Sequence, residues 1–165
     1  MTRLLGLDLG ERRIGLALAD SDGSAARPHA TIRRGRTLEA DAAAIRAVVE
    51  AESVDELVVG LPLEASGVEG PQATLTRTWA ASLGARLGLP VTLRDERLSS
   101  HVAETRLGPM KQDRSGGPPS KTQRDAYRAR VDREAAAVIL QDELDTRAGL
   151  RSSLPRTPDS QEISR

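Results

Sequence analysis

The chain has 165 residues, equal numbers of acidic and basic side chains, and no cysteine. This length suits one domain with its own core, and the lack of cysteine excludes disulfides and thiolate zinc sites. No apolar run is long enough to span a membrane, so we expect a soluble, cytoplasmic protein.

The zero net charge hides an uneven distribution of charge. Residues 39–69 hold eight acids and one base, whereas residues 106–133 hold eight bases and three acids. The basic segment is either a solvated loop or a surface for phosphates. Because Trp79 and Tyr127 are the only aromatic residues, a base-stacking platform is not expected.

The first third of the chain has the pattern of a β-meander. Apolar residues alternate over residues 4–9 and 14–18, with a tight connection at Gly10 to Arg12, which predicts a β-hairpin. Residues 28–32 are expected to form a third antiparallel strand. The period then changes to that of a helix, with Thr37 as a plausible N-cap.

The middle of the chain alternates strands and helices. Residues 56–62 form a continuous apolar run, typical of a strand buried on both faces. Gly70 and Pro71 precede a helix that should end at Leu87, and residues 91–96 are expected to be the fifth strand.

A third helix is expected to be capped by Ser99 or Ser100, and residues 108–123 are rich in Gly, Pro and Ser and read as a mobile loop. The last helix is expected over residues 125–146. Residues 148–165 are expected to be a disordered tail. The order predicts an α/β fold with a five-stranded mixed sheet and helices on both faces.

Three acids interrupt apolar patterns. Asp8 lies in the middle of the first strand, Glu96 follows the fifth strand, and Asp132 lies at the edge of the apolar stripe of the last helix. Carboxylates from distant segments that meet at one sheet are the oxygen ligands that Mg²⁺ or Mn²⁺ prefers. The three acids are therefore candidate metal ligands.

Each acid also has a simpler explanation. Asp8 can accept hydrogen bonds from the amides of residues 10–12, and Glu96 can pair with Arg94 or Arg97. Asp132 can pair with Arg128 one turn earlier on the helix. Only the coincidence of the three acids favours a site.

Four segments resemble the signature blocks of the YqgF family, a ribonuclease H-like group related to Holliday junction resolvases: GLDLGERRIGLA, VVGLPLEASGVEG, DERLSS and VDREAAAVIL. The resemblance covers roughly residues 3–144 and implies a nuclease domain over residues 1–147. Family members are described as nucleases that mature the 5′ end of the small-subunit ribosomal RNA precursor.

The resemblance implies that Asp8, Glu96 and Asp132 hold a divalent metal, Mg²⁺ or Mn²⁺, and that residues 60–62 line the same side of the sheet. In the strand order 3-2-1-4-5 that is usual for this fold, Glu96 and Asp8 lie two strands apart, about 10 Å at ~4.8 Å per strand. Asp95 therefore stays open as an alternative ligand.

We therefore expect a metal-dependent endonuclease acting on structured RNA, with precursor ribosomal RNA as its partner, no membrane association, and either a monomer or a homodimer. The expected nucleic-acid-binding residues are Arg12, Arg97, Lys121, Arg124, Arg128 and Arg130. Two alternatives remain open: a resolvase of branched DNA, and a non-catalytic RNA-binding assembly factor. An ATPase of the actin and sugar-kinase type would need two such lobes, and this chain has length for one.

Overall fold

The computed structural model describes residues 1–96, 99–110 and 115–153. The five strands are β1 (Arg3–Leu9), β2 (Arg13–Asp20), β3 (Arg27–Arg33), β4 (Glu56–Leu61) and β5 (Val91–Asp95). The four helices are α1 (Leu38–Glu52), α2 (Pro71–Leu87), α3 (Ser99–Leu107) and α4 (Lys121–Ser153).

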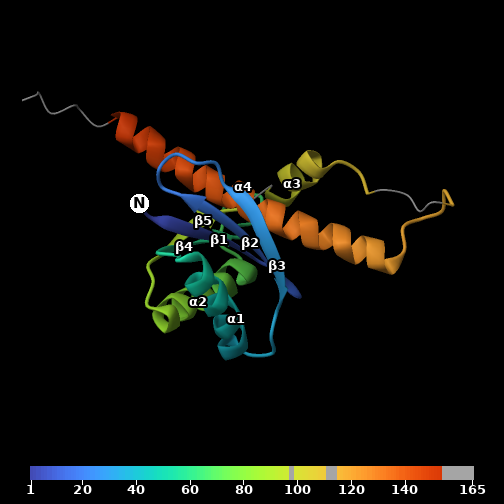
Figure 1. Ribbon diagram of the computed structural model, residues 1–165, viewed down its shortest axis with the longest axis horizontal. Coiled ribbons are helices and arrows are strands. Elements are labelled where there is room, and N and C mark those ends of the chain that lie inside the picture. Colours follow the sequence, from blue (N-terminus) through green and yellow to red (C-terminus); the bar gives the residue numbers. More distant parts are fainter. Residues whose placement is uncertain (97–98, 111–114, 154–165) are drawn as a thin grey trace, which may run out of the picture.

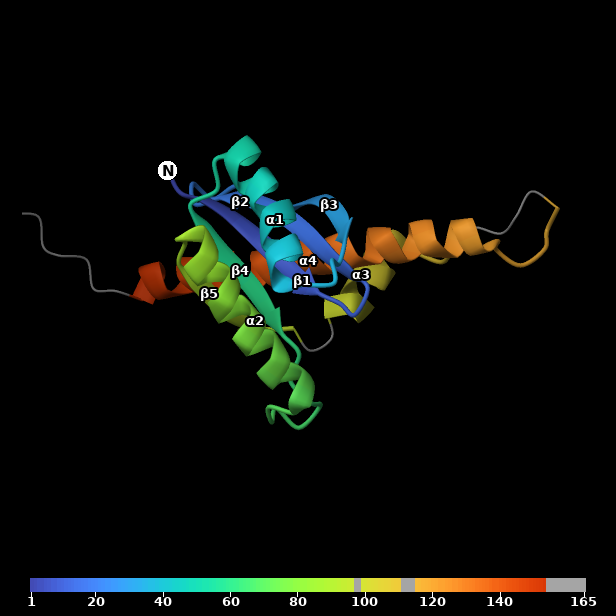
Figure 2. The same ribbon diagram turned by 90° about the horizontal axis from the view of Figure 1, so that it is seen from below.

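The strands form one mixed sheet in the order β3-β2-β1-β4-β5. The first three strands are antiparallel, and β4 and β5 run parallel to β1. Helices α1 and α2 cover one face, and α4 crosses the other (Figure 1, Figure 2). The predicted mixed sheet and strand order are confirmed.

Large aliphatic side chains fill the space between the sheet and helices α1 and α2. Leu5 and Leu7 of β1 and Leu16 of β2 are fully buried there, together with Ile45 of α1 and Leu83 of α2. The predicted N-cap is also present, since Thr37 Oγ1 accepts the Ala40 amide at 3.2 Å. This face is an ordinary hydrophobic core, and its burial is a main source of the fold's stability.

The opposite face has small residues, which let α4 lie very close to the sheet. A Cβ atom on Gly15 of β2 would lie 1.9 Å from the carbonyl oxygen of Asp132, and one on Gly6 of β1 would lie 2.9 Å from that of Ala136. At the edge of the sheet, Thr31 Oγ1 of β3 donates to the Ala129 carbonyl at 2.5 Å. Helix α4 therefore crosses the strands diagonally, and its first turns project beyond β3 (Figure 2).

Helix α4 is longer than the predicted 125–146. It begins earlier because Ser120 and Gln123 form a capping box: Ser120 Oγ accepts the Gln123 amide at 3.2 Å, and Gln123 Oε1 accepts the Ser120 amide at 2.7 Å. It continues to Ser153, and Leu144 packs against the small-residue face of the sheet. Residues 121–123 are thus helix rather than loop, while 111–114 and 154–165 lie outside the described residues.

Helix α3 packs on α4 through Ala103, Val131 and Ala135. It already includes Ser99, whose amide donates to the Glu96 carbonyl at 3.0 Å. No helix within the described ranges is both long enough and apolar enough to cross a membrane.

Candidate active site

Asp8 lies near the end of β1 on the face that α4 covers. It is paired in register with Gly15 of β2, and residues opposite each other in an antiparallel pair point to the same face. Because Gly15 touches the backbone of Asp132, the Asp8 side chain lies beside this part of α4. It is half-buried at the place where helix, β1 and β2 meet.

Glu96 reaches Asp8 by crossing over β4. The intervening residue of β4 is Gly60, and a Cβ atom there would lie only 2.5 Å from Glu96 Oε2. The absence of a side chain at Gly60 gives the glutamate its path, and the Glu96 carboxyl group comes close enough to Asp8 for the charge of Asp8 to raise the pKa of Glu96. The two-strand gap expected from the sequence is therefore spanned by the length of Glu96 and by a glycine.

Asp95 points to the other face of the sheet. Val91 and Leu93 of β5 pack against the core formed with α1 and α2, and side chains alternate along a strand. Asp95 is exposed and in register with Leu61. This geometry favours Glu96 over Asp95 as the partner of Asp8.

The Asp8 and Glu96 pair is electrostatically strained. Burial, followed by the charge of Asp8, raises the pKa of Glu96 to about 9. Burial is also the main cause that raises the pKa of Asp8, and the nearby charge of Asp132 adds to it. Two carboxylates this close in a partly buried site cannot both ionise without a large cost in free energy unless a cation binds.

One oxygen of this pair has no hydrogen-bond partner among the described residues. Glu96 Oε2 is buried and accepts no hydrogen bond from the part of the chain that the structure describes. Buried carboxylate oxygens are normally satisfied by a donor or a metal, because burying an unpaired polar atom costs free energy. Pairs of acids with displaced pKa values are frequent at functional sites.

Asp132 comes from α4 and forms an ion pair with Arg13, which was not among the predicted site residues. Arg13 Nε of β2 donates to Asp132 Oδ2 at 2.6 Å, with both side chains about a quarter exposed, 28% and 24%. Arg13 lies two residues before Gly15, on the same face, and this strand alternation is the signal that could have identified it. Across the described ranges, no three acidic or histidine side chains gather closely enough to form a complete metal site.

The simpler explanations of the three acids receive little support from the contacts. The amide of Gly10 donates to the Arg13 carbonyl at 2.9 Å, and none of the described amides of residues 10–12 donates to Asp8. Arg94 approaches Glu143, at 3.7 Å, and Asp132 pairs with Arg13 instead of Arg128. Arg97 lies outside the described residues.

The basic residues expected to bind nucleic acid are arranged around Asp132 and along α4. Arg128 lines a cavity of about 200 Å³ with Arg13 and Asp132. Arg12 is exposed in the turn between β1 and β2, and three further residues are exposed on α4: Lys121, Arg124 and Arg130. The first turns of α4 thus carry positive charge past the edge of the sheet.

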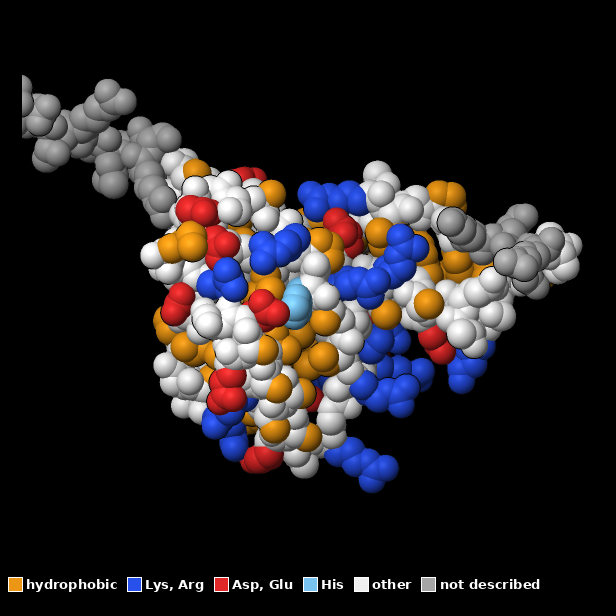
Figure 3. All heavy atoms as spheres, viewed as in Figure 1, with side chains coloured by type: hydrophobic (Ala, Val, Ile, Leu, Met, Phe, Trp, Pro, Cys, Tyr) orange, Lys and Arg blue, Asp and Glu red, His pale blue; other side chains and the backbone are white. Residues whose placement is uncertain are grey.

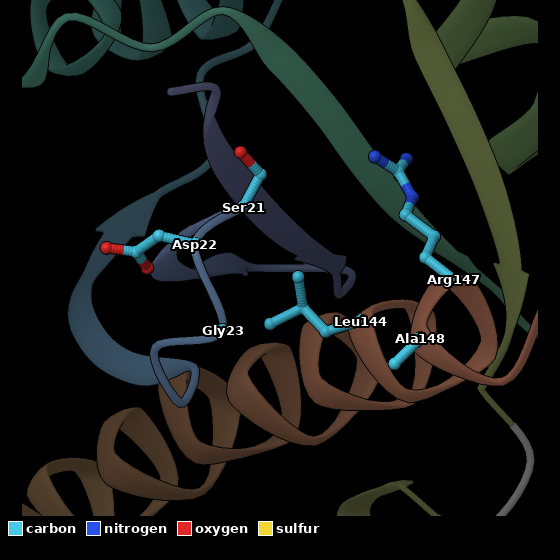
Figure 4. Close-up of a pocket in the computed structure, with 6 residues that line it drawn as sticks. All are labelled: Ser21, Asp22, Gly23, Leu144, Arg147 and Ala148. Carbon is cyan, nitrogen blue, oxygen red and sulfur yellow. The ribbon is translucent and has the colours of Figure 1, made fainter. Parts of the chain in front are cut away.

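A second cavity, of about 290 Å³, lies toward the opposite end of α4 (Figure 4). It is lined by Ser21 and Asp22 of the loop after β2 and by Leu144 and Arg147 of α4 (Figure 4). The guanidinium of Arg147 is already paired, with Glu56 at 3.1 Å and Glu143 at 3.0 Å. These ion pairs explain the conformation of Arg147 without a ligand.

Comparison with known proteins agrees with this geometry. Residues 2–146 match the RuvX family, described as "Holliday junction resolvase". A protein of Anaeromyxobacter dehalogenans named "Putative pre-16S rRNA nuclease" is 51% identical over 146 residues, covering 88% of this chain and 98% of that protein. A protein of Chloroflexus aurantiacus with the same name is 42% identical over 144 residues, with 87% of each chain covered.

Among solved structures, Thermus thermophilus RuvC in complex with a Holliday junction substrate has a TM-score of 0.51 at 13% identity, covering 90% of this chain and 97% of that one. At this identity the likeness concerns the fold alone, and it confirms the predicted ribonuclease H-like architecture. The resemblance noted from four short motifs extends over nearly all of residues 2–146. The chain therefore belongs to the RuvX family, the same group as the YqgF family.

Proposed function

We propose that this protein is a metal-dependent endonuclease that hydrolyses phosphodiesters in structured RNA. Its substrate is the precursor of the small-subunit ribosomal RNA in the cytoplasm, where it processes the 5′ end. The observation that carries the proposal is the buried contact of Asp8 with Glu96, which leaves Glu96 Oε2 without a partner among the described residues. The names of the relatives support the choice of substrate.

The donor atoms of the three acids match the chemistry of a hard divalent cation. Asp8, Glu96 and Asp132 supply only carboxylate oxygens, the donor type that Mg²⁺ and Mn²⁺ prefer. When bound, such cations activate the attacking water and stabilise the leaving oxygen of a phosphodiester. In this proposal Asp8 and Glu96 hold the cation from the sheet, Asp132 completes the site from α4, and Arg13 orients Asp132.

The basic residues hold the substrate. Arg128 lies beside Asp132 and binds the phosphate nearest the site, and further phosphates meet the exposed basic side chains Arg12, Lys121, Arg124 and Arg130. Such contacts supply affinity and position without reading sequence. Sequence readout by base stacking is not expected, because Trp79 is only 8% exposed.

The direct test is incubation of the purified protein with precursor ribosomal RNA in Mn²⁺, in Mg²⁺ and in excess EDTA. We expect cleavage near the 5′ end with either metal, none in EDTA, and none by Asp8→Asn in any buffer. Undiminished cleavage in EDTA would exclude the metal-dependent mechanism.

A second candidate is resolution of branched DNA, which the description of the RuvX family favours. The chemistry at the carboxylates would be the same, so only the substrate distinguishes the two. Cleavage of a four-way DNA junction but not of precursor RNA would select it. If neither substrate is cut but precursor RNA is bound, the protein is a non-catalytic assembly factor.

A further inference from the structure

The arginines of this protein differ in whether an acid lies beside them. Those within 4 Å of an acid are Arg3, Arg13, Arg34, Arg77, Arg86, Arg94, Arg106 and Arg147. In contrast, Arg12, Arg33 and Arg36 are exposed and form no ion pair with any residue that the structure describes. We refer to these three residues as the arginine edge.

Arg33 lies on the face that carries the candidate site. It is in register with Arg13, which contacts Asp132, and opposite residues of an antiparallel pair share a face. Two residues earlier, Thr31 bonds to α4 on that same face. Arg33 is thus one strand beyond Arg13, and it lies two strands from Asp8 and two residues further along, roughly 12 Å away at ~4.8 Å per strand and ~3.4 Å per residue.

The segment after Arg33 is tied to the turn that carries Arg12. The Arg34 amide donates to the Arg12 carbonyl at 2.9 Å, and Arg34 Nη1 donates to the Gly10 carbonyl at 3.2 Å. The turn between β1 and β2 and the loop between β3 and α1 therefore form one surface. Arg12, Arg33 and Arg36 belong to these two adjacent segments.

A buried acid fixes the loop. Asp41 is 2% exposed, and its Oδ1 accepts the Gly35 amide at 2.7 Å while its Oδ2 lies 3.6 Å from Arg34 Nε. Trp79 Nε1 also approaches Oδ2, at 3.4 Å. Because Asp41 is committed to Gly35 and Arg34, it holds the loop in place without neutralising Arg33 or Arg36.

The position of the charge points to a polyanion. On the side of the molecule drawn in Figure 3, most Lys and Arg side chains lie beside β3 and the projecting part of α4. Most Asp and Glu side chains lie over the other half of that view. We propose that the arginine edge is a preformed binding surface for the phosphate backbone of a nucleic-acid duplex. The proposal rests on the proposed function, since it places this backbone next to the cleavage site.

The chemistry favours a duplex over a single strand. Unpaired guanidinium groups on a fixed loop bind phosphates, whereas single strands are held mainly by stacking on aromatic rings. Tyr127 is not free for stacking in this way, since its hydroxyl donates to the Gly108 carbonyl and its ring packs against α3 and α4.

The test is binding of a fluorescently labelled 20-base-pair RNA duplex in a salt titration, with Asp8→Asn present in every variant to prevent cleavage. Arg33→Ala with Arg36→Ala should reduce the slope of log K against log salt by about one for each lost phosphate contact. At 0.1 M salt, affinity should fall roughly eightfold per lost contact.

Two double variants serve as matched controls. Arg27→Ala with Arg46→Ala removes two exposed arginines that pair with no described acid and lie away from the edge, and it should leave the slope unchanged. Arg33→Lys with Arg36→Lys keeps the charges and should retain most of the slope. Thermal melts should show that all three double variants are folded.

Equal slopes for the parent and for Arg33→Ala with Arg36→Ala would overturn the proposal, as would failure of the parent to bind the duplex. These substitutions could instead change the oligomeric state and leave RNA binding intact. That result would assign the arginine edge to contact between protein copies and would also overturn the proposal. Failure of the proposed nuclease function can be told apart from failure of the binding surface. In the first case precursor RNA is not cleaved, but the duplex still binds through the arginine edge.

Discussion

The two faces of the sheet are built from different residues and have different roles. The face under α1 and α2 is filled with large side chains such as Leu7 and Leu16. The face under α4 has Gly6, Gly15 and Gly60, and the helix and the Glu96 side chain occupy the space that larger residues would fill. Both faces bury apolar side chains, since Leu4, Val58 and Leu140 are fully buried under α4, but only the second face also leaves room beside its glycines for acids to approach one another.

This difference explains how a small domain can tolerate a costly site. Buried carboxylates that repel one another destabilise the protein, and burial of leucine and isoleucine on the other face offsets that cost. If this division is correct, substitutions on the two faces should separate loss of stability from loss of function.

The largest loss of stability is expected where the backbones of α4 and β2 touch. Gly15→Ala places a Cβ atom 1.9 Å from the Asp132 carbonyl oxygen, so α4 must move away from the sheet. We expect a loss of about 3 kcal/mol or more in urea unfolding, together with loss of the stabilisation by Mn²⁺. Leu7→Ala should lose a comparable 2–5 kcal/mol yet keep the response to Mn²⁺. If Gly15→Ala has wild-type stability, α4 does not lie where the structure places it.

The next largest effect is the pH dependence of stability that Glu96 causes. Glu96 has its pKa raised to about 9 in the folded chain, against about 4.5 when unfolded. Between these values the unfolded chain releases a proton that the folded chain keeps, so stability in EDTA should fall as pH rises, by at most about 1.4 kcal/mol per pH unit. Glu96→Gln has no proton to release, and unfolding curves at pH 5 and pH 8 should show a smaller decrease. An identical pH dependence in both proteins would argue against a buried acid at this position.

A smaller effect on stability, but a clear effect on activity, is expected at Gly60. The Cβ of Gly60→Ala would meet the Glu96 carboxyl at 2.5 Å and Ile139 Cδ1 at 2.6 Å, and both are ends of flexible side chains. The fold should therefore survive with a loss of about 1–3 kcal/mol, while cleavage of precursor RNA falls at least tenfold. Gly149→Ala, whose Cβ would have no neighbour within 4 Å, is the matched control and should cleave normally.

The elements of the sheet could be predicted because their signals are local. Alternation over residues 4–18 and the apolar run at 56–62 specify strands, and their order followed from the resemblance of short motifs. The end of α4 could not be predicted, since its last turns depend on contacts with the distant β2 and β4 strands, such as that between Arg147 and Glu56.

The sequence singles out the three acids of the candidate site but not the residues that position them. Asp8, Glu96 and Asp132 stand out because each breaks an apolar pattern, whereas Arg13 follows another arginine and carries no such signal. The path of Glu96 over Gly60 could not be predicted, because it depends on the register of β1, β4 and β5, which places these side chains on one face of the sheet. The choice of these acids as metal ligands stays a prediction. Of the tail predicted over residues 148–165, residues 148–153 belong to helix α4, and the rest lies outside the described residues.

Thermal melts of the parent and of Asp8→Asn, each in EDTA and in Mn²⁺, test whether Asp8 faces a bound cation. Removing the charge relieves repulsion with Glu96 and Asp132, so Asp8→Asn should be at least as stable as the parent in EDTA. It should also lose most of the increase in Tm that Mn²⁺ gives the parent by binding the folded state. A loss of roughly 1–3 kcal/mol in Asp8→Asn, with and without Mn²⁺, would instead mean that Asp8 is held by hydrogen-bond donors of its own fold, and would contradict the account.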